Sequence, residues 1–124
     1  MSYRIAHWCI HVLDLEKSLE FYEKALGLHV DHSFGPEDGS WSNTYLKSDD
    51  GDFLVELTWN KGRTEPYLNG GKDTHLAFET EDYEAAHKLH EEMGCICFDN
   101  TRMGLHFIQD PDGSWLEVVP AGKY

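Results

Sequence analysis

Positively charged residues are scarce in this chain of 124 residues. It contains 10 Lys and Arg residues against 23 Asp and Glu residues, and its formal net charge is −13. A surface with this balance repels the phosphates of nucleic acids and the anionic headgroups of membranes. We therefore expect neither as a partner, and an anionic ligand would need cations placed locally.

Cysteine and long apolar runs are also scarce. The three cysteines (Cys9, Cys95 and Cys97) make an odd number without a disulfide framework, which fits a reducing cytosol. No apolar run approaches the roughly 20 residues of a membrane helix, and no charged-then-apolar leader pattern opens the chain. We expect a cytoplasmic protein with no membrane partner. A hydrophobic content of 40% is ordinary for a globular domain.

The most informative stretch is residues 52–60, which read Asp-Phe-Leu-Val-Glu-Leu-Thr-Trp-Asn. Apolar, β-branched and aromatic residues predominate there, as in a half-buried strand. Glu56 stands in the middle, where the pattern expects an apolar side chain. A buried carboxylate costs several kcal/mol unless a partner or a cation compensates it.

The chain repeats its own pattern. His7 precedes Asp14 by seven residues, and His75 precedes Asp82 by seven. Each aspartate can cap a helix, and the two helices end at Gly27 and Gly94. Strands are expected at 4–12, 28–33, 42–46 and 52–60, and again at 74–80, 95–98, 105–108 and 114–119.

Each half therefore reads strand, helix, then three strands, and the duplication predicts an α+β fold of two paired modules. We expect one domain over 1–124, with repeats at about 4–60 and 73–120. A glycine-rich connector, 61–72, joins them. Two such sheets can curl together so that equivalent positions face each other across a cleft.

Each half also carries a histidine in its first strand and a glutamate in its last: His7 and Glu56, then His75 and Glu117. Taken singly, each residue could have an ordinary role instead of binding a metal: the histidines could be hydrogen-bonded to the backbone, and the glutamates could be exposed to water. Packing of a hydrophobic core does not explain why both halves have a histidine in the first strand and a glutamate in the last. We predict that the four side chains meet on one divalent cation, since two imidazoles and two carboxylates suit Ni, Co, Zn, Mn or Fe.

The other histidines are weaker candidates for function. His87 and His90 are three residues apart on the second helix, which predicts one solvated face. His29 and His32 are expected in a loop or edge strand. His106 is expected near the cleft, with no evident partner.

These residues resemble the vicinal-oxygen-chelate superfamily and, within it, the short bacterial glyoxalase I (lactoylglutathione lyase) family. The resemblance runs from about residue 5 to residue 119. It rests on the first His7 strand, residues 14–22 with Leu26-Gly27, Glu-Leu-Thr-Trp-Asn at 56–60, Thr-His-Leu-Ala-Phe at 74–78, and Asp-Pro-Asp-Gly at 110–113 leading into Leu116-Glu117.

The resemblance implies paired βαβββ modules, a homodimer, and a metal held by His7, Glu56, His75 and Glu117. It implies isomerisation of the hemithioacetal of methylglyoxal and glutathione, or another small thiol, to the S-lactoyl thioester. Glu117 is then the catalytic base, and Glu56 is a ligand with a second catalytic role. The short chain resembles the nickel- or cobalt-activated type, with zinc as the alternative.

The resemblance also implies substrate contacts. Asn60 matches a thiol-binding position, and Arg102 offers a cation from the second half, with Arg63 and Lys61 as weaker candidates. His11 stands where the family usually places an arginine for a glutathione carboxylate, so the thiol can differ. Two rival functions remain open: another metalloenzyme of this fold, such as an acyl-CoA epimerase, and a metal-free small-molecule binding protein.

Overall fold

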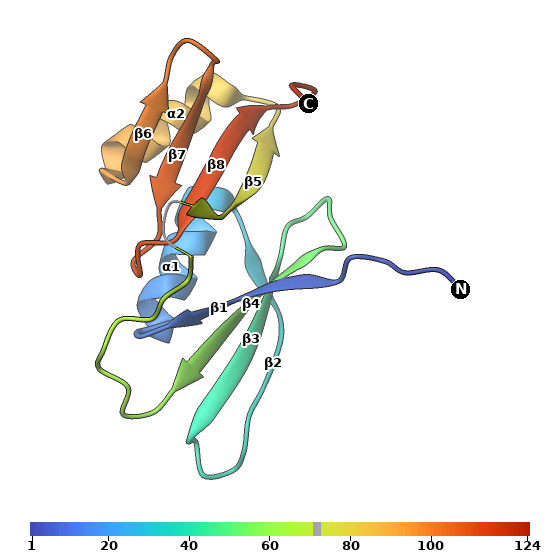
Figure 1. Cartoon of the computed structure of the whole chain (residues 1–124), viewed down its shortest axis with the longest axis vertical. Coiled ribbons are helices and arrows are strands. Elements are labelled where there is room, and N and C mark those ends of the chain that lie inside the picture. Colours follow the sequence, from blue (N-terminus) through green and yellow to red (C-terminus); the bar gives the residue numbers. More distant parts are fainter. Residues whose placement is uncertain (71–72) are drawn as a thin grey trace. The chain divides into compact units, whose positions relative to one another are not determined.

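The computed structural model describes residues 1–70 and 73–124. Gly71 and Lys72, at the end of the expected connector, lie outside the described residues. The chain divides into two compact units, Met1–Tyr67 and Leu68–Tyr124. Each unit consists of a four-stranded mixed sheet and one helix (Figure 1).

The two units have the same order of elements. The first contains β1 (His7–Val12), α1 (Leu15–Leu26), β2 (His29–Phe34), β3 (Trp41–Lys47) and β4 (Leu54–Asn60). The second contains β5 (His75–Thr80), α2 (Tyr83–Met93), β6 (Ile96–Asn100), β7 (Leu105–Gln109) and β8 (Trp115–Pro120). The expected βαβββ modules are confirmed, and the strand ends differ from the expected ones by at most three residues.

The two sheets also share one topology. Their strand orders are β1-β4-β3-β2 and β5-β8-β7-β6, and in each the first strand runs parallel to the last. The remaining neighbours are antiparallel. Both outer hairpins shift register near the same place, between Val30 and His32 and between Ile96 and Phe98. The duplication therefore extends to the irregularities of the sheets.

Both helices begin and end as the sequence predicts. The side chains of Asp14 and Asp82 accept hydrogen bonds from the backbone N–H groups of Lys17 and Ala85. Such a cap satisfies a donor that has no partner within the helix. Each helix ends at a glycine in the left-handed region, where a Cβ atom would be strained.

One face of each sheet forms a core with its helix, and the opposite face, called the open face below, carries the predicted histidine and glutamate. In the first unit, Ile10, Val12, Val55 and Leu57 alternate with the residues of the open face. In the second unit the corresponding core residues of β7 and β8 include Ile108, Leu116 and Val118. Because strand residues alternate between faces, His7 and Glu56 lie on the open face of the first sheet, and His75 and Glu117 on that of the second.

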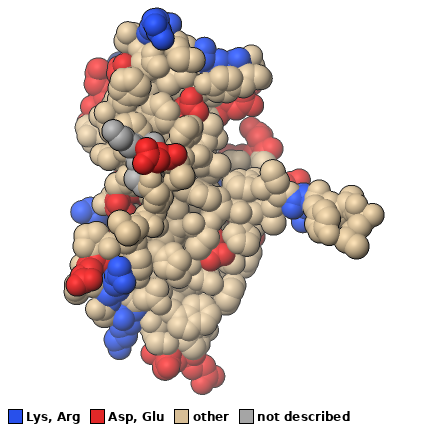
Figure 2. All heavy atoms as spheres, viewed as in Figure 1, with Lys and Arg blue, Asp and Glu red and all other residues tan. Residues whose placement is uncertain are grey.

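The charge distribution agrees with the composition. On the face drawn in Figure 2, acidic and basic side chains are intermixed in small groups, so this face offers no broad basic surface. Over the described part of the chain, neither helix is long and apolar enough to cross a membrane.

Candidate functional site

In the first unit, neighbouring parallel strands bring His7 and Glu56 together. Cys9 of β1 is aligned with Glu56 of β4, and His7 lies two residues earlier on the same face. The Nε2 atom of His7 is 3.2 Å from Oε1 of Glu56. The Glu56 residue is only 8% exposed, whereas the imidazole of His7 is partly accessible. His7 and Glu56, two of the four predicted ligands, are therefore in contact.

Glu56 is held by hydroxyl groups on both carboxylate oxygens. The Tyr45 hydroxyl donates to Oε1 at 2.7 Å, and the Thr58 hydroxyl lies 3.0 Å from Oε2. Burial alone raises the pKa of this carboxyl group, but hydrogen bonds from Tyr45, Cys9 and Thr58 outweigh burial and leave its pKa below the ordinary value. The same bond to Glu56 raises the pKa of Tyr45 to about 12. Glu56 is thus a buried carboxylate with a fixed orientation and a lowered pKa.

The second unit repeats the contact through β5 and β8. Ala77 is aligned with Glu117, so His75 again lies two residues before the partner of the glutamate. The Nε2 atom of His75 is 3.3 Å from Oε2 of Glu117, which is 7% exposed. An aromatic ring lies edge-on to each imidazole: Tyr45 to His7, and Phe107 to His75.

The surroundings of the two glutamates differ. Tyr45 is the cross-strand neighbour of Glu56, and the residue in the equivalent register opposite Glu117 is Phe107, which has no hydroxyl. Val119, two residues after Glu117, occupies the position that Thr58 has after Glu56. Glu117 instead receives a bond from the exposed Tyr124 hydroxyl, at 3.1 Å. Glu117 therefore lacks the two fixed hydroxyl contacts of Glu56.

The two pairs have the spacing expected of cation ligands. Two ligands about 2.1 Å from one cation and roughly 90–110° apart lie about 3.0–3.4 Å from each other. The observed separations of 3.2 and 3.3 Å fall in that range. Within the described residues, no three His, Cys, Asp or Glu side chains form a metal-binding group. The structure thus has two His–Glu pairs, one in each unit, and a metal centre of four ligands stays a prediction.

Two of the predicted substrate residues lie together in the first unit, around a ring that the sequence interpretation missed. The Asn60 amide donates to the Tyr67 hydroxyl at 3.3 Å, and the His11 ring lies 5.1 Å from the Tyr67 ring, centroid to centroid. The guanidinium of Arg63 lies over the same ring at 4.2 Å. Its other contacts are the carbonyl oxygens of Glu65 and Pro66.

The third predicted substrate residue, Arg102, lies in the second unit. It is exposed in the turn between β6 and β7. That Arg102 binds the substrate together with Asn60 and His11 stays a prediction. Lys61, a weaker candidate, directly follows β4 and is exposed.

Two predictions about histidines are wrong. His90 is not on a solvated helix face: it is 1% exposed, and its Nδ1 lies 2.9 Å from Nε2 of His106. His106 is 0% exposed, and its Nδ1 lies 2.9 Å from the Tyr83 hydroxyl. The polarity of these residues suggested exposure, but the buried rings satisfy one another. His29 and His32 do lie in an edge strand, β2, as expected.

Tyr45 could have been found from the sequence. Tyr45 and Glu56 are equally distant from the turn at Asp50-Gly51, so a hairpin centred on that turn pairs them. Tyr67 gives no such signal, because it belongs to an irregular segment after β4.

A family model described as the Glyoxalase/Bleomycin resistance protein/Dioxygenase superfamily matches residues 4–118. The chain belongs to this superfamily. Solved structures with the same fold include a fosfomycin resistance protein of Listeria monocytogenes complexed with Mn(II) and an antibiotic binding protein of a Streptomyces species.

Several relatives resemble the chain over most of its length. It is 32% identical to a lactoylglutathione lyase of Neisseria meningitidis, covering 94% of this chain and 89% of the relative. It is 29% identical to the Pseudomonas aeruginosa lyase, covering 97% and 84%. The solved structure of the trypanothione-dependent glyoxalase I of Leishmania major superposes with a TM-score of 0.80 at 25% identity, covering 96% of this chain and 87% of that one.

Proposed function

We propose that this superfamily member is a metal-dependent glyoxalase I. It isomerises the hemithioacetal of methylglyoxal and a small thiol to the S-lactoyl thioester. The observation that carries this proposal is the repeated His–Glu contact, with separations of 3.2 and 3.3 Å at equivalent positions of two equivalent sheets. Relatives named lactoylglutathione lyase support it.

In this proposal one cation is shared by His7, Glu56, His75 and Glu117. Nickel or cobalt is the preferred metal and zinc the alternative. The two carboxylate charges balance the cation, which lowers the cost of their burial. When bound, the cation supplies Lewis acidity next to the oxygens on which negative charge develops. The site is completed within one chain or between the two subunits of a homodimer.

Glu117 moves the proton in this proposal. Its carboxylate takes the proton from the carbon bearing the hydroxyl and sulfur, and electron density moves onto the adjacent oxygens. The resulting carboxylic acid returns the proton to the neighbouring carbon, while the hydroxyl proton passes to the former carbonyl oxygen, and the thioester is formed. A base must reorient between the two carbons, and Glu117 lacks the two strand hydroxyls that hold Glu56. Glu56 and the two imidazoles keep their places.

The thiol partner is recognised in the first unit. Asn60 and His11 both contact Tyr67, and Arg63 provides a cation above that ring. Arg102 is a further contact in this proposal. Because the relatives are named for different thiols, glutathione or trypanothione, the thiol that this chain uses is part of the proposal.

Activity of chelated protein, with each metal added back in turn, tests this proposal. Methylglyoxal is mixed with glutathione or with trypanothione, and the thioester is followed by its absorbance. We expect nickel or cobalt to restore turnover and His7→Ala and His75→Ala each to abolish it. The matched control is His29→Ala, since His29 is an exposed histidine of an edge strand. Turnover that survives chelation would contradict metal catalysis.

A metal-free binding protein is the second candidate. Phe34 and Trp41 are exposed aromatic residues of the first sheet, and the Phe34 ring also lies near Tyr45. His32 stacks on Tyr45 at 4.4 Å. An aromatic surface of this kind can bind a flat small molecule without a cation. Tight ligand binding by the chelated protein, together with absence of turnover under all metals, would favour this function.

A further inference from the structure

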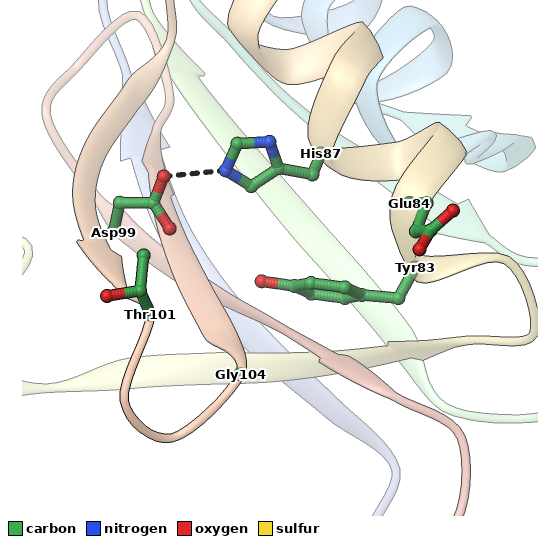
Figure 3. A pocket seen from close by; sticks show the side chains of 6 residues that line it. All are labelled: Tyr83, Glu84, His87, Asp99, Thr101 and Gly104. Carbon is green, nitrogen blue, oxygen red and sulfur yellow. Dashed lines mark hydrogen bonds and ion pairs between the residues drawn. The ribbon is translucent and has the colours of Figure 1, made fainter.

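A pocket of about 410 Å³ lies in the second unit, on the helix side of its sheet. Its lining comes from the start of α2, the end of β6 and the turn before β7: Tyr83, Glu84, His87, Asp99, Thr101 and Gly104. In Figure 3 the Tyr83 ring lies along one side, and His87 points across to Asp99. His75 and Glu117 lie on the opposite face of this sheet, so the pocket is separate from that ligand pair.

The polar lining is not required by the fold, because the first unit builds the same module without it. The repeat places Leu15 and Leu19 at the positions of Tyr83 and His87, each 68 residues earlier. In the same register Ser33 and Thr44 correspond to Asp99 and His106. The two hydroxyls simply bond to each other, at 3.0 Å. The fold alone therefore does not explain the polar side chains at these positions of the second unit.

Buried histidines fix the orientation of the Tyr83 ring. Its hydroxyl lies 2.9 Å from Nδ1 of His106, whose Nε2 lies 2.9 Å from Nδ1 of His90. Both histidines are almost fully buried. Because this chain anchors the hydroxyl, the ring presents a preorganised face to the pocket, and a ligand has less ordering entropy to overcome.

The charge of the lining is negative. Asp99 and Glu84 supply two carboxylates, and none of the six lining residues is lysine or arginine. The His87 Nε2 atom lies 2.6 Å from Oδ2 of Asp99. A carboxylate has about four acceptor positions, so this contact leaves Asp99 able to accept from a ligand.

We propose that this pocket binds a small organic ammonium ion. Its charged group hydrogen-bonds to Asp99, and its carbon skeleton lies against the ring of Tyr83. Carboxylates make their strongest hydrogen bonds with charged donors, and an aromatic face attracts cations. A bare metal ion fits less well, because the 2.6 Å between the His87 and Asp99 atoms is shorter than the roughly 3.0 Å separating two ligands of one cation.

The test is a titration of the full-length, isotope-labelled protein with benzylammonium, followed by amide NMR signals. Benzyl alcohol and benzoate serve as matched neutral and anionic probes. We expect saturable shifts at the start of α2 and in the turn between β6 and β7, and binding about tenfold weaker or worse for the other two probes, since a charge-assisted hydrogen bond is lost. The proposal would be overturned if the amide signals shifted only outside these two regions, or if benzoate bound as tightly as benzylammonium.

Variants separate the pocket from a general charge effect. Asp99→Asn should weaken benzylammonium binding by about tenfold, whereas Glu92→Gln, which removes one charge from an exposed position of the same helix, should leave binding unchanged. Tyr83→Phe keeps the ring but loses the bond to His106, so it should weaken binding by a smaller factor than Tyr83→Leu, which should abolish it. Thermal melting checks that each variant is folded. Equal affinities of the Asp99 and Glu92 variants would refute the assignment of the ammonium to Asp99.

Discussion

The two units place a histidine and a glutamate at the same register of the same sheet, yet they surround the glutamates differently. Glu56 is bonded to Tyr45 and lies within reach of the Thr58 hydroxyl, and its pKa is low despite burial. Glu117 has Phe107 and Val119 in the equivalent places. A duplicated scaffold can thus supply two similar ligands and still differentiate them through their neighbours. We infer that one carboxylate is fixed and that the other is free to move a proton.

The largest expected effect comes from replacing each glutamate by its amide. Glu117→Gln should lower turnover by about 10²–10⁴-fold, because a glutamine cannot accept the proton. Glu56→Gln should weaken metal binding, with a smaller loss of turnover at saturating metal. Steady-state rates over a series of metal concentrations distinguish the two effects, and circular dichroism checks folding. Equal losses at saturating metal would remove the difference between the two glutamates.

The polar chain of the second unit should make that unit sensitive to acid. Burial, then the neighbouring His90 and His87, lower the pKa of His106 from 6.5 to about 4, while Asp99 acts in the opposite direction. In the unfolded chain His106 takes up a proton near pH 6.5, and in the folded chain only near pH 4. The unfolded state therefore binds more protons between these values, and stability falls as pH decreases through this window.

Between pH 7 and pH 5 this difference amounts to about 2 kcal/mol in the free energy of opening. Amide hydrogen exchange of β7 in metal-free protein measures it locally. The equivalent strand of the first unit, β3, carries the uncharged Thr44 and serves as an internal control. His106→Asn should flatten the dependence in β7, and an unchanged slope in that variant would assign the effect to other groups.

The sequence allowed the fold to be predicted in more detail than the site. The matched positions of His7 and His75, Asp14 and Asp82, and the two closing glycines predicted both modules, because strand alternation and helix capping are local. The site prediction was a single cation shared by four side chains, and it stays a prediction. Parallel pairing of first and last strands, which the sequence did not reveal, brings each histidine beside the glutamate of its own unit.

Contacts between side chains of different elements were harder to predict. His90 and His106 were expected to be unpaired because each was judged by its own polarity, whereas their burial depends on each other and on Tyr83. Tyr67 contacts both Asn60 and His11, but it lies in an irregular segment whose sequence has no periodicity, so these contacts could not be predicted.

The smallest effect should come from exchanging the aromatic neighbours of the two glutamates. Tyr45→Phe removes the 2.7 Å hydrogen bond to Glu56 and should weaken metal affinity by about tenfold, as loss of an outer contact to a ligand does. Phe107→Tyr offers the second unit the hydroxyl that it lacks, opposite Glu117. That bond would hold the base in one orientation, so turnover should fall while metal affinity is kept or raised.

Calorimetric metal titration and rates at saturating metal separate the two variants. The double exchange, Tyr45→Phe with Phe107→Tyr, transfers the hydroxyl from one glutamate to the other at nearly constant composition. If neighbours alone differentiate the carboxylates, the double variant should combine the lower metal affinity of the first change with the slower turnover of the second. Recovery of wild-type behaviour would instead show that the scaffold responds only to the presence of one hydroxyl, wherever it lies.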